Sequence, residues 1–104
     1  MCVSTVLIQG RADNPQWVKS FKLGTSGDGQ TFAYVTSEGV SASADDAVVF
    51  DGNTDQTTVV EQQLPAPRFA RFLRLYPQSW HRHISMRWEV MACGARESQA
   101  DDHL

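Results

Sequence analysis

Two histidines near the end of the chain are the first side chains that could carry chemistry. His81 and His83 stand at positions i and i+2, so on a strand both imidazoles would face the same way. A zinc ion needs at least one more protein ligand, and the sequence offers only a distant residue such as His103 or an aspartate of the tail. We therefore expect no metal site here.

The segment from Asp51 to Asp55 begins like a calcium-binding loop. Acids stand at its first and fifth positions and Asn53 at its third. Such a loop needs glycine at position six and glutamate at position twelve, where this chain has Gln56 and Gln62. We expect instead a turn that is stabilised by its Asp and Asn side chains.

No catalytic motif stands out. The sequence contains neither the Gly-x-Ser-x-Gly nucleophile elbow nor a glycine-rich phosphate loop. Ser79, His81 and Asp55 follow no known triad pattern, and Cys2 and Cys93 lack a Cys-x-x-Cys partner. We predict that the chain is not an enzyme and holds no cofactor.

Charge is uneven along the chain. Nine Lys and Arg stand against twelve Asp and Glu, a net charge of -3 that argues against nucleic-acid binding. The segment 68–88 nevertheless contains five arginines, two histidines and no carboxylate. These arginines could attract phosphate or sulfate groups. The alternative that we favour is that several point inward and pair with acids such as Asp51 or Glu89.

Alternation of apolar and polar residues predicts strands that would position these groups. In segment 84–90, apolar side chains share one face, and Ser, Arg and Glu share the other. In segment 17–23, Trp17, Phe21 and Leu23 fall on one side, and the glycines of 26–29 predict the hairpin turn that follows. Further strands are expected at 3–9, 31–35, 48–50, 57–64 and 71–76, the last two ended by Pro65 and Pro77, with a loop at 39–46. Six or seven short strands favour an antiparallel β-sandwich.

The two ends of the chain carry little structural signal. The first eight residues lack the basic segment of a signal peptide, and no apolar run approaches the roughly 18 residues of a membrane span. Residues 95–104 are acidic and poor in apolar groups, so we expect a disordered tail.

Five separated motifs, in matching order and spacing, resemble the discoidin family, also called the coagulation factor 5/8 type C domain. They are Gln9–Arg11 with Gln16–Leu23, Ser26–Gly29, Phe50–Asp55, Ala70–Pro77 and Ser79–Val90 with Cys93–Gly94. The resemblance implies a jelly-roll-like, galactose-binding-like β-sandwich over residues 1–94, and it places Trp80 to His83 in a structural turn.

The resemblance covers the C-terminal two-thirds of a family domain, without its first strands and two of its three ligand-facing loops. In the family, the cysteine matched by Cys93 bonds a cysteine at the domain start, which has no counterpart here. Cys2 precedes an interior strand, so we do not expect a Cys2–Cys93 bridge. A sheet edge or core face should be exposed, which predicts self-association. An alternative to a binding function is therefore a truncated structural fragment that self-associates without a ligand.

The ligand-facing loop that remains runs between the first two strands. The resemblance implies extracellular recognition, as in cell adhesion, of a glycan or protein, and the candidate contacts are Arg11, Asp13, Asn14, Gln16 and Trp17. For Trp17 we favour the alternative that it belongs to the core. Lipid-binding relatives carry a large apolar residue in this loop, and this chain has none, so anionic phospholipid such as phosphatidylserine is the alternative ligand. Some sugar-binding relatives hold calcium with a glutamate that Glu89 could match, but its companions would lie in the missing segment.

Overall fold

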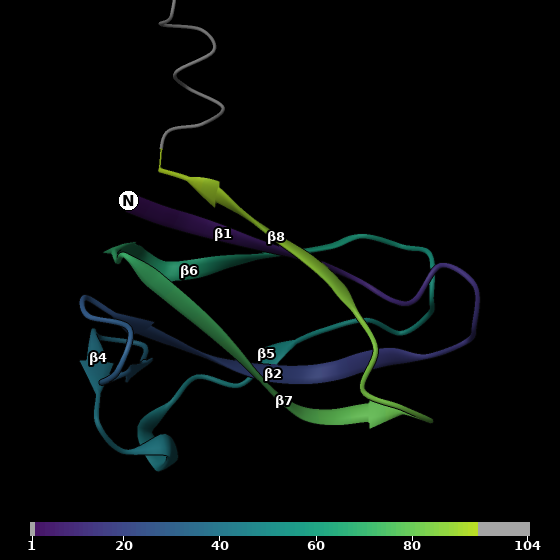
Figure 1. Cartoon of the computed structure of the whole chain (residues 1–104), viewed down its shortest axis with the longest axis horizontal. Coiled ribbons are helices and arrows are strands. Elements are labelled where there is room, and N and C mark those ends of the chain that lie inside the picture. The colour runs from purple at the N-terminus through teal and green to yellow at the C-terminus, as the bar shows by residue number, and fades with distance from the viewer. Residues whose placement is uncertain (1, 94–104) are drawn as a thin grey trace, which may run out of the picture.

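The computed structural model describes residues 2–93, which form two antiparallel β-sheets packed face to face (Figure 1). In chain order their elements are β1 (Cys2–Gln9), β2 (Trp17–Ser26), β3 (Ala33–Val35), β4 (Val40–Ser41), the 3-10 helix η1 (Ala44–Asp46), β5 (Phe50–Asp51), β6 (Val60–Phe69), β7 (Phe72–His81) and β8 (Arg87–Ala92). The three-stranded sheet has the order β6-β1-β8. The five-stranded sheet has the order β4-β3-β2-β5, and its fifth strand, β7, also pairs with β2. The predicted all-β sandwich is confirmed. Within the described residues, no helix is long and apolar enough to cross a bilayer.

The core lies between β1 and β2, the central strands of the two sheets. Val6 and Ile8 of β1 and Phe21 and Leu23 of β2 are fully buried. Phe21 stacks on Phe50 of β5 with ring centroids 5.3 Å apart. These side chains point inward because alternate residues of a strand face opposite sides of a sheet.

The predicted position of Trp17, on the same face as Phe21 and Leu23, is wrong because β2 is irregular. Its pairing with β7 shifts register between Val18 and Ser20 and again between Ser20 and Phe21. Such a bulge changes which face the following residues occupy. As a result Val18 joins Phe21 in the core, whereas Trp17 is half-buried and lies outside the core cluster.

Two strands run through the prolines that were predicted to end them. β6 continues past Pro65, and β7 continues past Pro77. Within residues 2–93, β6 pairs only with β1 and β7 only with β2, so each strand is an edge. An edge strand tolerates proline because one row of its N–H groups has no neighbour to bond. The segment predicted as a loop at 39–46 also contains β4 and η1.

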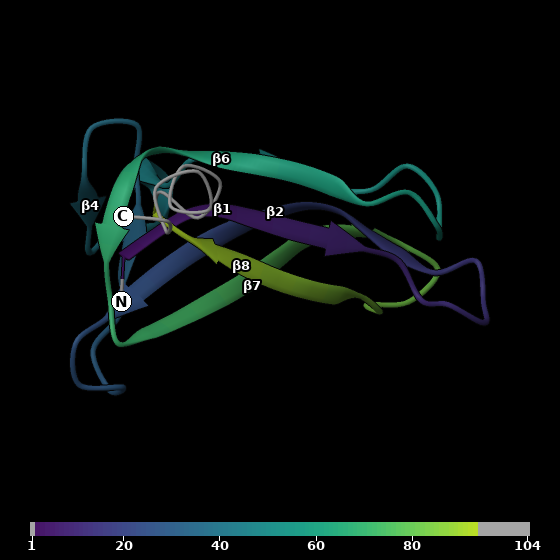
Figure 2. The same ribbon diagram turned by 90° about the horizontal axis from the view of Figure 1, so that it is seen from above.

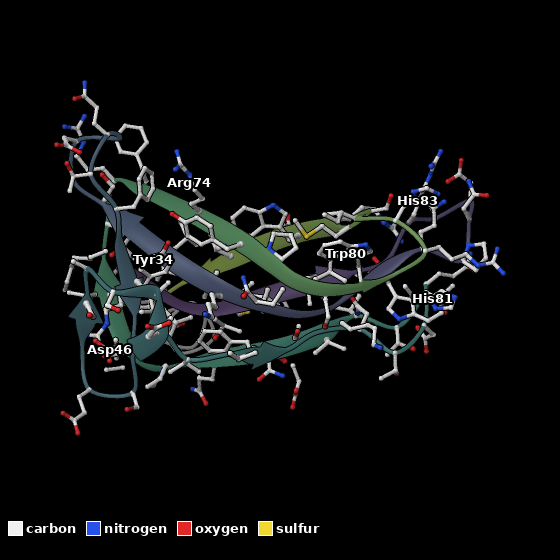
Figure 3. All side chains as sticks on the ribbon, turned by 90° about the horizontal axis from the view of Figure 1, so that it is seen from below. Tyr34, Asp46, Arg74, Trp80, His81 and His83 are labelled. Atoms are coloured by element: carbon white, nitrogen blue, oxygen red, sulfur yellow. A yellow bond between two sulfur atoms is a disulfide. The ribbon has the colours of Figure 1, made fainter. Side chains whose placement is uncertain are left out.

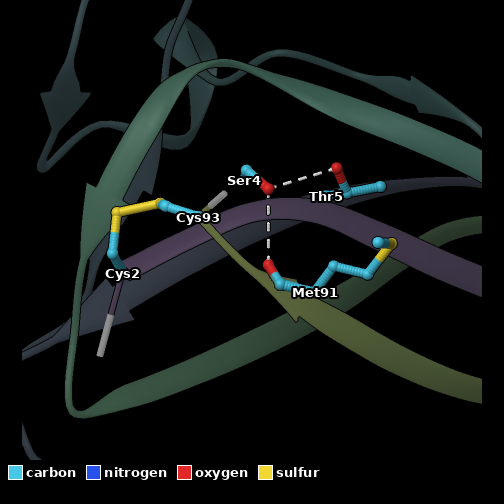
Figure 4. Close-up of a disulfide and its surroundings, with 5 residues drawn as sticks. All are labelled: Cys2, Ser4, Thr5, Met91 and Cys93. Carbon is cyan, nitrogen blue, oxygen red and sulfur yellow. Dashed lines mark hydrogen bonds between the residues drawn. A yellow bond between two sulfur atoms is a disulfide. The ribbon is translucent and has the colours of Figure 1, made fainter. Parts of the chain in front are cut away.

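A Cys2–Cys93 disulfide joins the start of β1 to the end of β8, which contradicts our expectation (Figure 4). The two strands are antiparallel neighbours, so the first residue of one lies beside the last residue of the other. The two Cα atoms are 5.3 Å apart, and the Cys93 N–H donates to the Cys2 carbonyl at 2.9 Å. The expectation failed because it took Cys2 as lying before β1, whereas Cys2 is the first residue of that strand. The predicted tail, 95–104, lies outside the described residues.

Candidate binding loops at one end of the sandwich

Three loops meet at one end of the molecule, opposite the disulfide (Figure 1). They are residues 10–16 between β1 and β2, residues 52–59 between β5 and β6, and residues 82–86 between β7 and β8. Side chains join the first loop to the other two. Gln56 Nε2 donates to the Ala12 carbonyl at 3.4 Å, and Ser85 Oγ donates to Gln16 Oε1 at 3.0 Å.

The loop 10–16 is closed by its own side chains. Arg11 Nε donates to Asp13 Oδ1 at 2.6 Å and Nη2 to Oδ2 at 3.4 Å, while Nη1 donates to Gln16 Oε1 at 3.3 Å. The Arg11 guanidinium holds the pKa of Asp13 below its ordinary value of 3.8. The backbone adds a hydrogen bond of 2.9 Å from Arg11 N–H to the Gln16 carbonyl. The ion pair is exposed, so its main effect is to fix loop shape rather than to add stability.

Two buried features hold these loops at the base. Asn53 is 1% exposed, and its Nδ2 donates at 3.0 Å to the carbonyls of both Ile8 and Thr58, which ties the end of β1 to the second loop. A Cβ on Gly10 would lie 2.7 Å from Gln56 Cα and 2.9 Å from the Gln16 carbonyl oxygen. Only glycine therefore allows the first two loops to approach so closely.

The segment 51–55 is a turn stabilised by its Asp and Asn side chains, as predicted. Asp55 Oδ1 accepts the N–H groups of Thr57 at 3.0 Å and Thr58 at 2.7 Å, and Oδ2 accepts the Thr58 hydroxyl at 2.8 Å. The backbone N–H of Thr58 is the largest of the effects that lower the pKa of Asp55. Both carboxylate oxygens of Asp55 thus accept hydrogen bonds within the turn.

A pocket of about 500 Å³ opens beside the loops, on the five-stranded sheet. Its wall includes Trp17 and Lys19 of β2, Asp51 of β5 and His81 of β7. The rings of Trp17 and His81 are stacked with centroids 4.2 Å apart. Sequence reasoning missed this contact, since only the pairing of Trp17 with His81 across β2 and β7 brings the two residues together.

The structure brings together most of the predicted ligand contacts. Arg11, Asp13 and Gln16 form one hydrogen-bonded group, and the Asn14 carbonyl accepts the Gln16 N–H at 2.7 Å within the same loop. Trp17 instead lines the adjacent pocket. Gln56 and Ser85, which brace the loop, carried no signal in the sequence.

The two histidines of the predicted turn do not face one another as metal ligands. His81 is the last residue of β7 and stacks on Trp17, whereas His83 follows in the loop, its N–H donating to the His81 carbonyl at 2.8 Å. Figure 3 shows both at the loop end. Between them, Arg82 has a φ of 67°, which turns the chain. Within residues 2–93, no three His, Cys, Asp or Glu side chains gather as metal ligands would, and His103 lies outside this range.

The arginines of segment 68–88 do not pair with the acids we expected. Within the described residues, neither Asp51 nor Glu89 forms an ion pair with them. Arg74 instead lies over the ring of Phe32, with 3.9 Å from Cζ to the centroid, and Arg87 Nε donates to the Gly10 carbonyl at 3.0 Å. The expected ion pairs with Asp51 and Glu89 are therefore not formed within these residues.

Arg68 lowers the stability of the fold at its position in β6. It pairs with the buried Val3 across β6 and β1, and its Nε and Nη2 are buried with no hydrogen-bond partner within the described residues. Buried, unpaired donors on a charged group destabilise a fold.

We expect Arg68→Met to raise the free energy of unfolding by about 1–2 kcal/mol, measured by urea denaturation. The exposed Arg71→Met is the matched control and should change it by less than about 0.5 kcal/mol. A loss of stability in Arg68→Met would contradict the assignment.

These observations define a class of protein: a disulfide-closed antiparallel β-sandwich with braced polar loops at one end. The F5/8 type C domain family matches over residues 1–90. The chain belongs to this family, and the resemblance seen in its sequence is confirmed.

Relatives and solved structures agree with this assignment. The human EGF-like repeat and discoidin I-like domain-containing protein 3 is 36% identical over 95 residues, which cover 89% of this chain and 19% of that protein. Mouse retinoschisin is 31% identical over 96 residues, 90% of this chain and 40% of that protein. Discoidin II from Dictyostelium discoideum superposes with a TM-score of 0.70 at 27% identity over 86% of this chain and 32% of that one. The chain thus spans less than half the length of each of these relatives.

Proposed function

We propose that this domain is an extracellular recognition module for cell adhesion, which binds a glycan or protein ligand through the loops at the end of its sandwich. The observation that carries the proposal is the braced loop 10–16. It presents Arg11 and Asp13, both exposed, in a geometry that two other loops support. Loops on a rigid sandwich are common positions for binding residues.

The chemistry of this loop suits a polar ligand. A carboxylate and a guanidinium held side by side offer acceptors and donors to adjacent sugar hydroxyls or to a peptide backbone. The ligand loses little binding energy to loop ordering, because the Arg11–Asp13 pair and the Gln16 contacts already fix the shape. The pocket beside Trp17 would extend the contact surface.

The same loop gives less support to phospholipid binding. Its apolar side chains are Ala12 and Pro15, both exposed and both too small to enter a bilayer deeply. Membership of the F5/8 type C family supports a binding rather than a catalytic role, and its relatives include retinoschisin and neuropilin-2.

The test is adhesion of cultured cells to wells coated with the 104-residue chain. We expect binding that Asp13→Ala weakens at least about tenfold, because the loss of one charged contact costs roughly 1.4 kcal/mol or more. Asp45→Ala, an exposed acid in η1, is the matched control and should bind like the wild type.

Pretreatment of the cells separates the ligand classes. Periodate, which cleaves sugar diols, should abolish adhesion to a glycan, and trypsin should abolish adhesion to a protein. Binding that survives both treatments and is matched by phosphatidylserine vesicles at low salt would overturn the proposal in favour of lipid. Equal adhesion of Asp13→Ala and wild type would show that the site lies elsewhere.

A further inference from the structure

One long side of the sandwich is open to solvent between β7 and β8. Figure 2 shows these two strands along the same side of the molecule, with β6 on the opposite side. Within the described residues, β8 pairs only with β1 and β7 only with β2, so each presents an unpaired edge. Within these residues, no strand joins the two sheets along this side.

Two tryptophans mark this opening. Trp80 pairs with Val18 and Trp88 with Ile8, and both partners are fully buried. Directly paired residues point to the same face of a sheet, so both tryptophans lie on the core-facing side. They are nevertheless 43% and 37% exposed (Trp80 is labelled in Figure 3). Core-facing tryptophans exposed to this degree are typical of an interaction surface.

The edge of β8 is the one best suited to pair with another strand. β6 contains Pro65 and Pro67, and β7 contains Pro77, and prolines on an edge discourage further pairing. β8, RWEVMA, contains none. Its pairing with β1 is unshifted from Met91 to Arg87, and the disulfide at Cys93 fixes its far end. This edge is thus straight, anchored and open.

We propose that β8 pairs antiparallel with β8 of a second copy of this chain, about a two-fold axis at Trp88. The charges along the strand are complementary in this register alone. Arg87 of each copy faces Glu89 of the other, while Trp88 faces Trp88. Opposite charges directly across two strands stabilise the pair, and like charges destabilise it. In such an isologous contact, each favourable pair occurs twice.

The side-chain environment fits this arrangement. Arg87 and Glu89 lie on the outer face, since they pair with Gln9 and Leu7 of β1, not with its core residues. Arg87 uses Nε for the Gly10 carbonyl, which leaves its terminal nitrogens for the second copy's carboxylate. On the inner face, Trp88 would meet its counterpart and the partly buried Val90 would lie opposite Met86 of the second copy, so that apolar side chains cover the opening.

Charge reversal tests the proposed dimer, and reversing both charges together should restore it. Sedimentation equilibrium of the wild-type chain should show a dimer at about 50–100 μM. Arg87→Glu and Glu89→Arg should each weaken dimerisation at least about tenfold, because each places like charges opposite one another twice. The double variant R87E/E89R restores opposite charges and should dimerise like the wild type. Mixing the two single variants should yield a heterodimer, which native mass spectrometry can resolve by mass.

Controls make each outcome decisive. Glu38→Arg reverses an exposed charge in the turn before β4 and should leave the dimer unchanged. Circular dichroism of every variant tests that the fold is intact. A wild-type monomer at 100 μM would overturn the proposal, and the open face would then belong to another polypeptide segment. A dimer insensitive to both reversals would equally overturn it, because the contact would not involve β8.

Discussion

Replacing both cysteines, in the variant C2S/C93S, is expected to lower the free energy of unfolding by about 4 kcal/mol. The bridge closes a loop with a sequence separation of 91 residues, so its loss gives the unfolded chain far more conformational freedom. A loss of this size should greatly reduce the folded fraction, because the core of a domain of this size leaves little stability in reserve. Urea denaturation, followed by tryptophan fluorescence, measures the difference.

Reduction provides the control for this prediction. Dithiothreitol should lower the stability of the wild type to that of C2S/C93S and should leave the variant unchanged. A loss below about 1 kcal/mol in the variant would contradict the prediction. It would mean that the ladder between β1 and β8 alone holds the two ends together.

Asn53→Ala is expected to cost about 3 kcal/mol of stability and to disorder the loops at that end of the sandwich. Its side-chain amide donates to the carbonyls of Ile8 and Thr58, and the substitution would remove both hydrogen bonds. Because Ile8 is fully buried, water cannot easily replace the lost donor there. Thermal denaturation and amide hydrogen exchange in residues 10–16 and 52–59 would report the two effects.

The other asparagine of the chain is the matched control. Asn14 lies in loop 10–16 and is only partly buried, so Asn14→Ala should change stability by less than about 0.5 kcal/mol. If Asn53→Ala were equally mild, the base of the loops would be held by Gly10 packing and backbone hydrogen bonds instead.

The sequence predicted the fold well where alternation alone decides the structure. Segment 3–9 became β1, with Val6 and Ile8 facing the core, and the resemblance carried by five motifs was confirmed. Alternation fails at an irregular position. The bulges after Val18 exchange the faces of Trp17 and Val18, and no residue type in that stretch signals a bulge.

Errors about prolines and cysteines share one physical cause. Whether Pro77 ends a strand depends on whether that strand has a neighbour on its N–H side, which is a property of the whole sheet. Whether Cys2 meets Cys93 likewise depends on β1 and β8 being antiparallel neighbours. The spacing of residues in the sequence does not reveal which distant strands pair with one another. Arg11, Asp13 and Gln16 could be grouped from the sequence because they lie in one short segment, whereas His81 reaches Trp17 and Ser85 reaches Gln16 only through the fold.

The position of the disulfide also determines how this domain can be presented. Cys2 and Cys93 lie side by side at one end of a body 45 Å long, and the three loops lie at the other. A polypeptide that leads into Cys2 or away from Cys93 would therefore approach from the end opposite the three loops. The domain could be mounted on a surface, or repeated along an array, with every loop cluster directed outward and unobstructed by its own tether.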